Sequence, residues 1–427
     1  MKKLLCSVFS TVFAFSLFSA QATQATTISK IPAQQLIQQI ISTDTDETEK
    51  LLFIQMLGSN ENYHADIAPL KPILFDENSS ANIKTTLLSI ADFSSVESIS
   101  LLKEVLENSD NTVAFRALIE LWQEHPQEAL LEALDILKET SGFTDSEKTR
   151  AAITIIGAAA RGGVLQFTTE EESWFIQNCK QLLNTTSNNM MKDTIVLALS
   201  DLGSFEALDV VVTSPVVENS FKNDVVVENI NNLTLSEQND LKSQVIQPYA
   251  ANADYAYAVY RDGVNTGIWG DQWHTGLVNG SSTTNSSYII HAPGPGGSTG
   301  YTNFSGFKNG ENFKGYYKPK YSMSDSKKSS VMNTAKRLAA LAIPYTAGGQ
   351  MGYSATNTGR TIQPEDIATI RCDGVVEYSY EYNGIRIGGG NSDWNISIDK
   401  DANFNAHTGA AITPKKQTES YMTFVHS

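Results

Sequence analysis

Apolar residues recur at helical spacing along the first half of the chain. In residues 101–106 and 129–137, leucine, valine, alanine and isoleucine are spaced with charged residues between them, so that one side of a helix is apolar. Polar breaks at 108–111 and 141–142 divide the pattern into pieces of about 10 to 14 residues. The pattern over residues 23–247 therefore predicts an all-α domain of short amphipathic helices.

Two segments of this helical half match each other. Leu88–Glu97 is similar to Leu197–Glu206, 109 positions later, and three units of about 36 residues would fill the interval. The region resembles a HEAT-like α-solenoid of paired helices, in which Asp92 and Asp201 would close the turn between two helices. An irregular helical bundle is the alternative. Repeats of this kind are mostly scaffolds and binding surfaces, so a protein partner is a possible role for this acidic domain.

The second half has the pattern of strands and turns. The run 255–260 is rich in tyrosine and ends at a turn signal, Asp262-Gly263. Residues 274–278 lead into Asn279-Gly280 and the apolar run 287–292 follows, which predicts a hairpin with a histidine at each end. The tail, with Ile396, Ile398 and 421–425, also has strand character. We therefore expect an antiparallel sheet.

Two helices are predicted among these strands. The first covers about 326–341 and stops at Pro344, because proline cannot continue a helix. The second begins at Cys372, since apolar and aromatic residues follow that cysteine at helical spacing. Residues 248–427 thus form an α+β domain in which one helix starts with a cysteine.

Charge divides at the same place as the secondary-structure pattern. Residues 23–247 hold 14 Lys or Arg against 33 Asp or Glu, whereas 248–427 hold 15 against 14. Fifteen of the sixteen tyrosines and 22 of the 28 glycines follow Pro248. Such a joint shift marks a domain boundary, and the net charge of −16 excludes a basic nucleic-acid-binding footprint over the whole molecule.

The first 22 residues have the pattern of a signal peptide. Lys2 and Lys3 precede an apolar run at about 4–18, and Ala20-Gln21-Ala22 supplies the small residues of a cleavage site. No later apolar stretch reaches the ~18 to 20 residues that a membrane span needs. We expect export to the periplasm or the exterior, with no transmembrane segment after signal removal; an amphipathic first helix is the alternative.

The mature chain keeps two cysteines, which is too few for a disulfide scaffold. Cys179 lies among Phe175, Ile176 and Leu182 and has the surroundings of a core thiol. The alternative is a disulfide between Cys179 and Cys372, which would abolish thiol chemistry. The sequence contains no CxxC spacing of the kind found in structural zinc sites. We expect neither a metal nor a cofactor.

Cys372 has the setting of a nucleophile. Unpaired N–H groups at a helix N-terminus stabilise a thiolate and should lower its pKa below the free value of about 8.5. A base must also hold the proton, and a third group must orient that base. His274 and His291 can fill these roles if their hairpin packs against the helix. Each of the three residues also has a non-catalytic interpretation: Cys372 as a buried thiol, His274 as a strand cap and His291 as a polar edge residue.

Local motifs favour the catalytic reading. Residues 274–280 (HTGLVNG) and 288–294 (YIIHAPG) closely resemble the histidine hairpin of NlpC-type cell-wall peptidases. Residues 342–349 (AIPYTAGG) resemble the G-x-P-Y-x-x-G-G segment of that family. Residues 371–378 (RCDGVVEY) resemble its D-C-S-G nucleophile helix, and the Gly-Ile within 383–385 (NGI) matches the dipeptide that follows it. The resemblance covers most of residues 255–390 and implies a papain-like fold.

The order of these motifs departs from the standard family, because here the hairpin precedes the cysteine. The order is similar to that of the circularly permuted branch, which includes lecithin:retinol acyltransferase-like proteins. Chain order does not decide the chemistry, since one site can be assembled from either end. The permuted branch is nevertheless associated with lipid and acyl substrates as well as with peptides.

The resemblance implies a role for each site residue. Cys372 would be the nucleophile, His274 the general base and His291 its orienter. Tyr345 would support the oxyanion or bind substrate, although packing alone would also explain it. Around the nucleophile, Arg371 replaces the usual Asp and Asp373 the usual Ser. An arginine there would favour an anionic group, which puts the standard γ-D-glutamyl-diamino-acid specificity in doubt.

Three functions follow as expectations. The first is an exported cysteine amidase or peptidase that cleaves peptidoglycan stem peptide through an acyl-enzyme. The second keeps the fold but is an acyltransferase or thioesterase for a lipid or acylated substrate. The third is a binding module with an inactive second half. A calcium-loop spacing from Asp399 to Asn405 lacks the glycine and the bidentate glutamate of such loops, so we interpret it as a polar turn.

Overall fold

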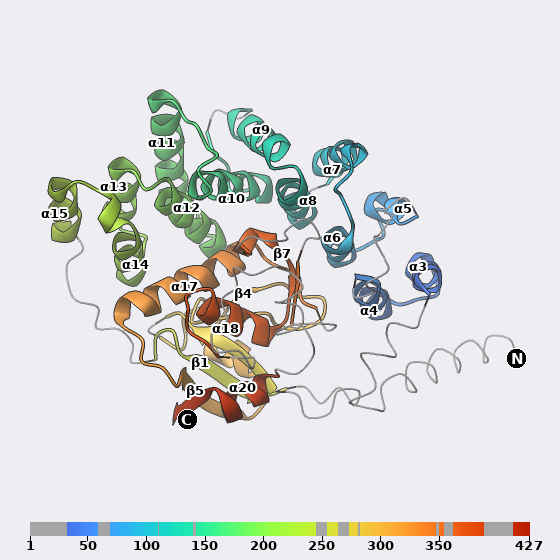
Figure 1. Cartoon of the computed structure of the whole chain (residues 1–427). Helices are drawn as coiled ribbons and strands as arrows, with labels where there is room; N and C mark the ends of the chain where they lie inside the picture. Colours follow the sequence, from blue (N-terminus) through green and yellow to red (C-terminus); the bar gives the residue numbers. More distant parts are fainter. Residues whose placement is uncertain are drawn as a thin grey trace, which may run out of the picture.

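The computed structural model describes residues 32–58, 69–109, 111–139, 142–244, 254–263, 273–280, 282–346, 350–353, 362–387 and 413–427. Within these ranges the N-terminal part is helical, and the C-terminal part holds a six-stranded antiparallel sheet with helices (Figure 1). The prediction of an all-α region followed by an α+β region is therefore confirmed. Residues 1–22, His64, Pro248, Ile396, Ile398 and the calcium-like spacing lie outside the described residues.

The N-terminal part consists of short helices. Their bounds are α3 Ala33–Ile41, α4 Glu47–Gly58, α5 Lys71–Phe75, α6 Ala81–Ile90, α7 Val96–Asn108, α8 Asn111–Glu124, α9 Pro126–Lys138, α10 Glu147–Arg161, α11 Thr169–Thr185, α12 Asn189–Leu202, α13 Phe205–Thr213, α14 Asn219–Asn229, η1 Ile230–Asn232 and α15 Leu235–Gln244. Serine, threonine or asparagine caps several of the N-termini through its side chain, as expected where the chain turns sharply into a helix.

These helices form two layers. The even-numbered helices α4 to α14 pack in succession, each against the next, and form the inner layer of a curved array. The odd-numbered helices pack on the outside of their neighbours (Figure 1). Each pair therefore buries one apolar face against the adjacent pair, which is how a chain of short amphipathic helices acquires a continuous core.

The two matching segments occupy equivalent places in this array. The first segment begins at the end of α6, and the second begins at the end of α12. Helices α8 and α10 of the inner layer lie between them, so the interval of 109 residues contains three two-helix units. Ser95 and Ser204 in the two segments are both N-caps, of α7 and of α13. The predicted turn role holds for Asp92, whose carboxylate accepts the Ser94 N–H at 2.9 Å. For Asp201 it is wrong, because that carboxylate pairs with arginines instead.

The C-terminal part is built on a sheet with the strand order β4-β3-β2-β1-β5-β8. The strands of this sheet are β1 Ala258–Asp262, β2 Trp273–Val278, β3 Ile289–His291, β4 Gly300–Thr302, β5 Phe313–Pro319 and β8 Met422–His426. The predicted hairpin is confirmed as β2 and β3, which pair antiparallel. The predicted tail strand is β8, and the strand predicted at 255–260 begins only at Ala258.

A smaller sheet of β6 Met351–Tyr353 and β7 Ile367–Ile370 leads into the cysteine helix. The remaining helices are α16 Phe304–Lys308, α17 Asp325–Ala340, η2 Pro364–Asp366, α18 Cys372–Glu381 and α20 Pro414–Ser420. The two predicted helices are confirmed as α17 and α18, the second beginning at the predicted cysteine. None of the helices in the described ranges is long and apolar enough to cross a membrane.

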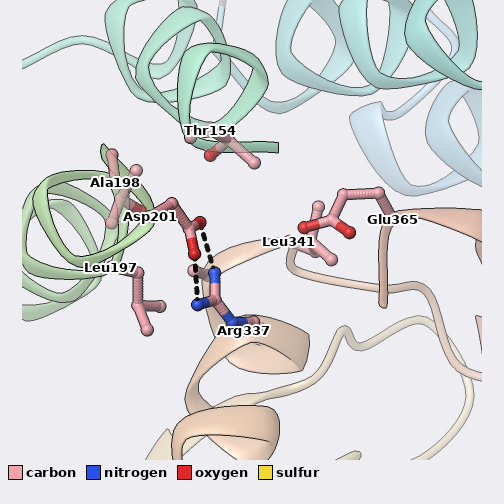
Figure 2. A pocket seen from close by; sticks show the side chains of 10 residues that line it. Thr154, Leu197, Ala198, Asp201, Arg337, Leu341 and Glu365 are labelled. Carbon is pink, nitrogen blue, oxygen red and sulfur yellow. Dashed lines mark hydrogen bonds and ion pairs between the residues drawn. The ribbon is translucent and has the colours of Figure 1, made fainter. Parts of the chain in front are cut away.

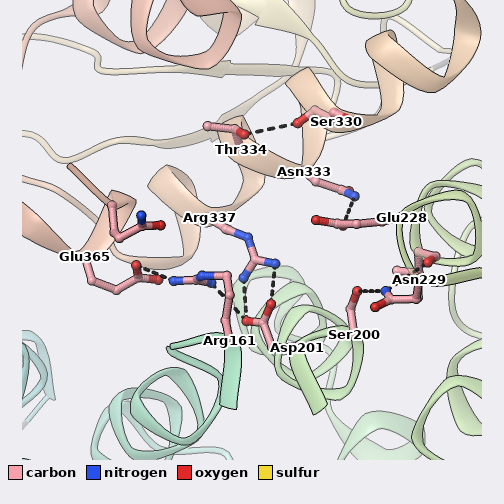
Figure 3. A network of polar contacts seen from close by, with 12 residues as sticks. Arg161, Ser200, Asp201, Glu228, Asn229, Ser330, Asn333, Thr334, Arg337 and Glu365 are labelled. Carbon is pink, nitrogen blue, oxygen red and sulfur yellow. Dashed lines mark hydrogen bonds and ion pairs between the residues drawn. The ribbon is translucent and has the colours of Figure 1, made fainter. Parts of the chain in front are cut away.

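The two parts meet along the inner layer of the helical array. Helix α17 packs against α12 and α14, η2 against α8, and β7 against α6. Asp201 of α12 forms a bidentate ion pair with Arg337 of α17, with both N–O distances 2.6 Å (Figures 2 and 3). Arg161 of α10 bridges Asp201 at 3.0 Å and Glu365 of η2 at 2.5 Å. Charged groups of the helical part therefore bind the chain's own second half.

Further acidic residues of the inner helices make the same kind of contact. Glu228 accepts from the Asn333 amide at 2.8 Å (Figure 3), and Asp224 accepts from the Tyr255 hydroxyl at 2.6 Å. Beside the Asp201–Arg337 pair lies a small cavity of about 20 Å³, which is room for about one water molecule (Figure 2). The inner helices of the array therefore contact residues of the chain's own second half.

Candidate active site

The hairpin brings the two predicted histidines together. His274 is the second residue of β2 and His291 the last of β3. His274 Nε2 lies 2.7 Å from His291 Nδ1, and the rings meet edge to face with centroids 5.0 Å apart. Seventeen residues separate them in the chain, and antiparallel pairing places them on one face of the sheet.

Gly276 makes this pairing possible. A Cβ built on Gly276 would lie 3.0 Å from the Cβ of His291, 2.8 Å from the Ile290 carbonyl oxygen and 2.7 Å from Ile289 Cγ2. The H-x-G spacing of the hairpin therefore has a steric reason: the residue two positions after the base must leave room for the orienter.

Replacing Gly276 with alanine is expected to lower turnover by about 10²-fold, because β3 must shift and carry His291 away from His274. The measurement is kcat/KM for the amide substrate identified by the assay described below. The matched control is Gly280→Ala, where the new Cβ would meet its nearest atom, Tyr288 Cα, at 3.4 Å. Equal activity of the two variants would contradict the steric role of Gly276.

Cys372 lies on a helix that packs against β2, the strand that carries His274. It is the first residue of α18, with Arg371 at the N-cap, and α18 packs against β2. The side chain is 5% exposed. Its sulfur interacts with the backbone N–H groups of Asp373 and of Thr275, the residue directly after His274. The structure therefore places the cysteine beside the strand position that carries the predicted base.

The pKa of the Cys372 thiol is raised, which corrects the expectation of a lowered one. Burial is the main cause, the Asp373 carboxylate adds to it, and together they raise the pKa of Cys372 to about 12. Arg371 and the two backbone N–H groups act in the opposite direction but are weaker. Desolvation of the charged form outweighs the helix N-terminus here. The resting group is a neutral thiol, so its proton must leave as the sulfur attacks.

Both histidines are neutral in the resting site. Burial lowers the pKa of His274 well below its usual range, with His291 and Arg261 as further causes. Burial, with Arg261, lowers the pKa of His291 to about 4. In the tautomer in which His274 Nε2–H donates to His291 Nδ1, the Nδ1 of His274 has a lone pair available. Such a nitrogen is what a general base for the Cys372 proton requires.

The depressed histidine pKa values predict how stability depends on pH. Above about pH 6.5 both histidines are neutral in the folded and unfolded chain, so they add no pH dependence. Between pH 6.5 and about 4 the unfolded chain binds a proton that folded His291 does not, so the contribution of His291 to the free energy of unfolding falls by an amount on the order of 3 kcal/mol. Urea titrations across this range measure it. His291→Asn should flatten this dependence, and an unchanged slope would contradict the prediction.

The other predicted site residues also lie near Cys372. Arg371 and Asp373 pair with each other, Nε to Oδ1 at 2.6 Å and Nη2 to Oδ2 at 2.7 Å. The charge of Arg371 is therefore balanced within the motif, which weakens the inference that this arginine selects an anionic substrate. The Tyr345 phenol interacts electrostatically with Cys372, and burial raises the pKa of Tyr345, so the hydroxyl remains a hydrogen-bond donor.

Three residues at the site were not identified from the sequence. Arg261 of β1 pairs in register with His274 on the adjacent strand β2, and the centroid of the Phe307 ring lies 5.4 Å from that of the His274 ring. Gln417 of α20 donates to the Asp373 carbonyl oxygen at 3.1 Å and accepts from the Tyr260 hydroxyl at 3.2 Å. An arginine that follows apolar residues in β1 is a weak signal that could have indicated Arg261. The other two depend on packing between distant segments and leave no local pattern.

The remaining candidate residues are structural. Cys179 is fully buried in α11 and is a free thiol, as is Cys372, so the core-thiol prediction is confirmed and no disulfide joins them. His125 Nε2 contacts the carbonyl oxygen of Phe93 at 2.7 Å. Over the described part of the chain, no three His, Cys, Asp or Glu side chains converge in a way that would hold a metal ion.

In comparisons with known proteins, no family model, no curated protein and no solved structure matches this chain. The site must therefore be interpreted from its own geometry.

Proposed function

We propose that the chain is an exported cysteine amidase or peptidase that cleaves an amide bond in peptidoglycan stem peptide. The observation that carries the proposal is the 2.7 Å contact between His274 Nε2 and His291 Nδ1, together with a free Cys372 beside the same strand. Nucleophile, base and orienter are the three groups that amide cleavage by a thiol requires. In this proposal the helical part is a HEAT-like solenoid, the C-terminal part has a permuted papain-like fold, and residues 1–22 direct export.

The reaction begins with two neutral groups. The Cys372 sulfur attacks the amide carbonyl carbon while His274 Nδ1 takes the thiol proton, and His291 stabilises the imidazolium that forms. In this mechanism the developing oxyanion accepts from the backbone N–H of Cys372, at the start of α18, and from the Tyr345 hydroxyl. His274 then protonates the leaving amine, and the carbon–nitrogen bond breaks to leave a thioester.

Hydrolysis completes the cycle. Water gives a proton to neutral His274 and attacks the thioester carbonyl. The carbon–sulfur bond then breaks, the acid is released, and the proton returns from His274 to Cys372. Each step returns His274 to the neutral form, which is the form that its lowered pKa favours at rest.

The second candidate is an acyltransferase or thioesterase, favoured by the order of the elements, in which β2 and β3 precede α18. A third is a binding module with an inactive site, favoured by the raised pKa of Cys372. One assay separates the three. The mature protein is incubated with purified muropeptides or with acyl lipids, and the products are read by mass.

Muropeptide fragments that have gained one water, with unchanged lipids, are the expected result. Acyl transfer or release in the lipid arm would instead establish the second candidate. No product in either arm, with Cys372 inert to iodoacetamide up to high pH, would establish the third.

A further inference from the structure

Arg261 lies at the centre of the site although no motif includes it. It pairs in register with His274 on the adjacent strand, so the two side chains leave the same face of the sheet as neighbours. Its guanidinium carbon lies 5.7 Å from the centroid of the Phe307 ring, and that ring also contacts His274 and His291. Arg261 and both histidines therefore form one cluster around Phe307, and Arg261 also interacts electrostatically with Cys372.

The donors of Arg261 are largely unused. The side chain is only 5% exposed, and its Nη1 donates to the Asp262 carbonyl oxygen at 2.7 Å. Its Nε is buried with no hydrogen-bond partner. No carboxylate in the described ranges forms an ion pair with it: Asp262 pairs with Lys314, and Glu311 acts on Arg261 only as a more distant charge. A buried guanidinium without a counter-ion is costly, and such a group is retained where a ligand supplies the missing charge.

Its state contrasts with that of the neighbouring Arg371. Two donors of Arg371 are engaged by Asp373, and those charges cancel. Arg261 instead interacts electrostatically with Cys372, which places its charge close to the sulfur that attacks the substrate. Of the two arginines, Arg261 has the donors and the unbalanced charge that anion recognition requires.

We propose that Arg261 is the specificity-determining residue of this site and binds a substrate carboxylate next to the amide bond that Cys372 attacks. The inference rests on the proposed amidase function and names the chemical class of its substrate. The planar guanidinium offers Nε and Nη2 as a fork that matches both oxygens of a carboxylate. Binding would also offset the positive charge that disfavours an imidazolium at His274, so a substrate with the carboxylate would make the base more basic.

Binding can be tested without turnover. Calorimetry with the Cys372→Ala protein compares L-alanyl-γ-D-glutamyl-L-lysine with its isoglutaminyl counterpart, which carries a carboxamide in place of one carboxylate. We expect the carboxylate peptide to bind at least about tenfold more tightly. Adding Arg261→Met should abolish this difference. Arg261→Lys, which keeps the buried charge but not the fork, should retain only part of it and guards against misfolding of the first variant.

Turnover distinguishes a binding role from a role in stabilising the oxyanion. With Cys372 intact, Arg261→Lys should raise KM for the carboxylate peptide by a larger factor than KM for the amide peptide. The acidic limb of the pH profile in Arg261→Met should move to higher pH, because Arg261 holds the pKa of both histidines down. An effect on packing alone would not move this limb.

Several results would overturn the inference. These are equal affinity for the two peptides, no affinity for either, or an equal loss of kcat on both substrates in the arginine variants. Cleavage of both peptides at equal rates by the unaltered protein would reject the inference but keep the amidase function. Failure to cleave any amide would reject the proposed function itself.

Discussion

Replacing Cys372 with alanine is expected to lower amide turnover by roughly 10⁴-fold or more, because no other described thiol lies beside the histidine pair. The variant should also fail to form a thioester that mass spectrometry can detect. Its fold should be kept, since the sulfur is replaced by a smaller group at the first position of α18. Turnover is measured with the substrate identified by product mass.

The matched control is Cys179→Ala, which removes the other described cysteine. Cys179 is fully buried in the core of α11, so the variant should lose about 1 kcal/mol of stability but keep its kcat. Iodoacetamide should label the unaltered protein at Cys372 slowly at neutral pH and faster as the pH rises, because the pKa of this thiol is about 12. Undiminished turnover in Cys372→Ala would end the cysteine mechanism.

Replacing Asp201 with asparagine is expected to lower the free energy of unfolding by about 3 to 5 kcal/mol. The Asp201 side chain is 6% exposed and that of its partner Arg337 is 9% exposed, so the change leaves a buried cation without its carboxylate. Arg161 loses one of its two partners as well (Figure 3). Chemical denaturation measures the loss. Arg161, which loses Asp201, also pairs with Glu365, two residues before β7 and its continuation to Cys372, so turnover should also fall.

Asp92→Asn is the control for this change because the sequence places Asp92 and Asp201 in equivalent positions. The Asp92 carboxylate accepts from the Ser94 N–H within a turn, and an asparagine oxygen can accept the same bond. Its loss of stability should therefore stay below about 1 kcal/mol. Equal destabilisation by the two substitutions would show that the ion pairs of Asp201 do not hold the two parts together.

Local patterns were sufficient to predict several elements of this fold. Helical spacing predicted the array in the first half, α17 and α18, and alternating apolar residues with a turn signal predicted the β2–β3 hairpin. Periodicity works because it reports which side of an element is buried, and that property is local. The three-unit interval between matching segments was also correct, since each pair of helices repeats the same local packing problem.

The motifs likewise indicated residues that lie near one another in the structure. His274, His291 and Cys372 lie together, and Gly276 explains the spacing of the hairpin motif. Charge state, in contrast, did not follow from them. A helix N-terminus predicts a lowered thiol pKa, but the sign of the shift is decided by burial, and burial depends on how many distant segments cover the sulfur.

The sequence by itself thus determined which elements form and which residue types meet on the hairpin and at the start of α18. Only the tertiary structure decided their partners. Arg371 is neutralised by Asp373, Asp201 binds Arg337 of the other part, and Arg261 lies beside His274 with no ion-pair partner among the described residues. The physical reason is one of range: periodicity and capping act over a few residues, whereas ion pairing, desolvation and cross-strand register depend on distances between segments far apart in the chain.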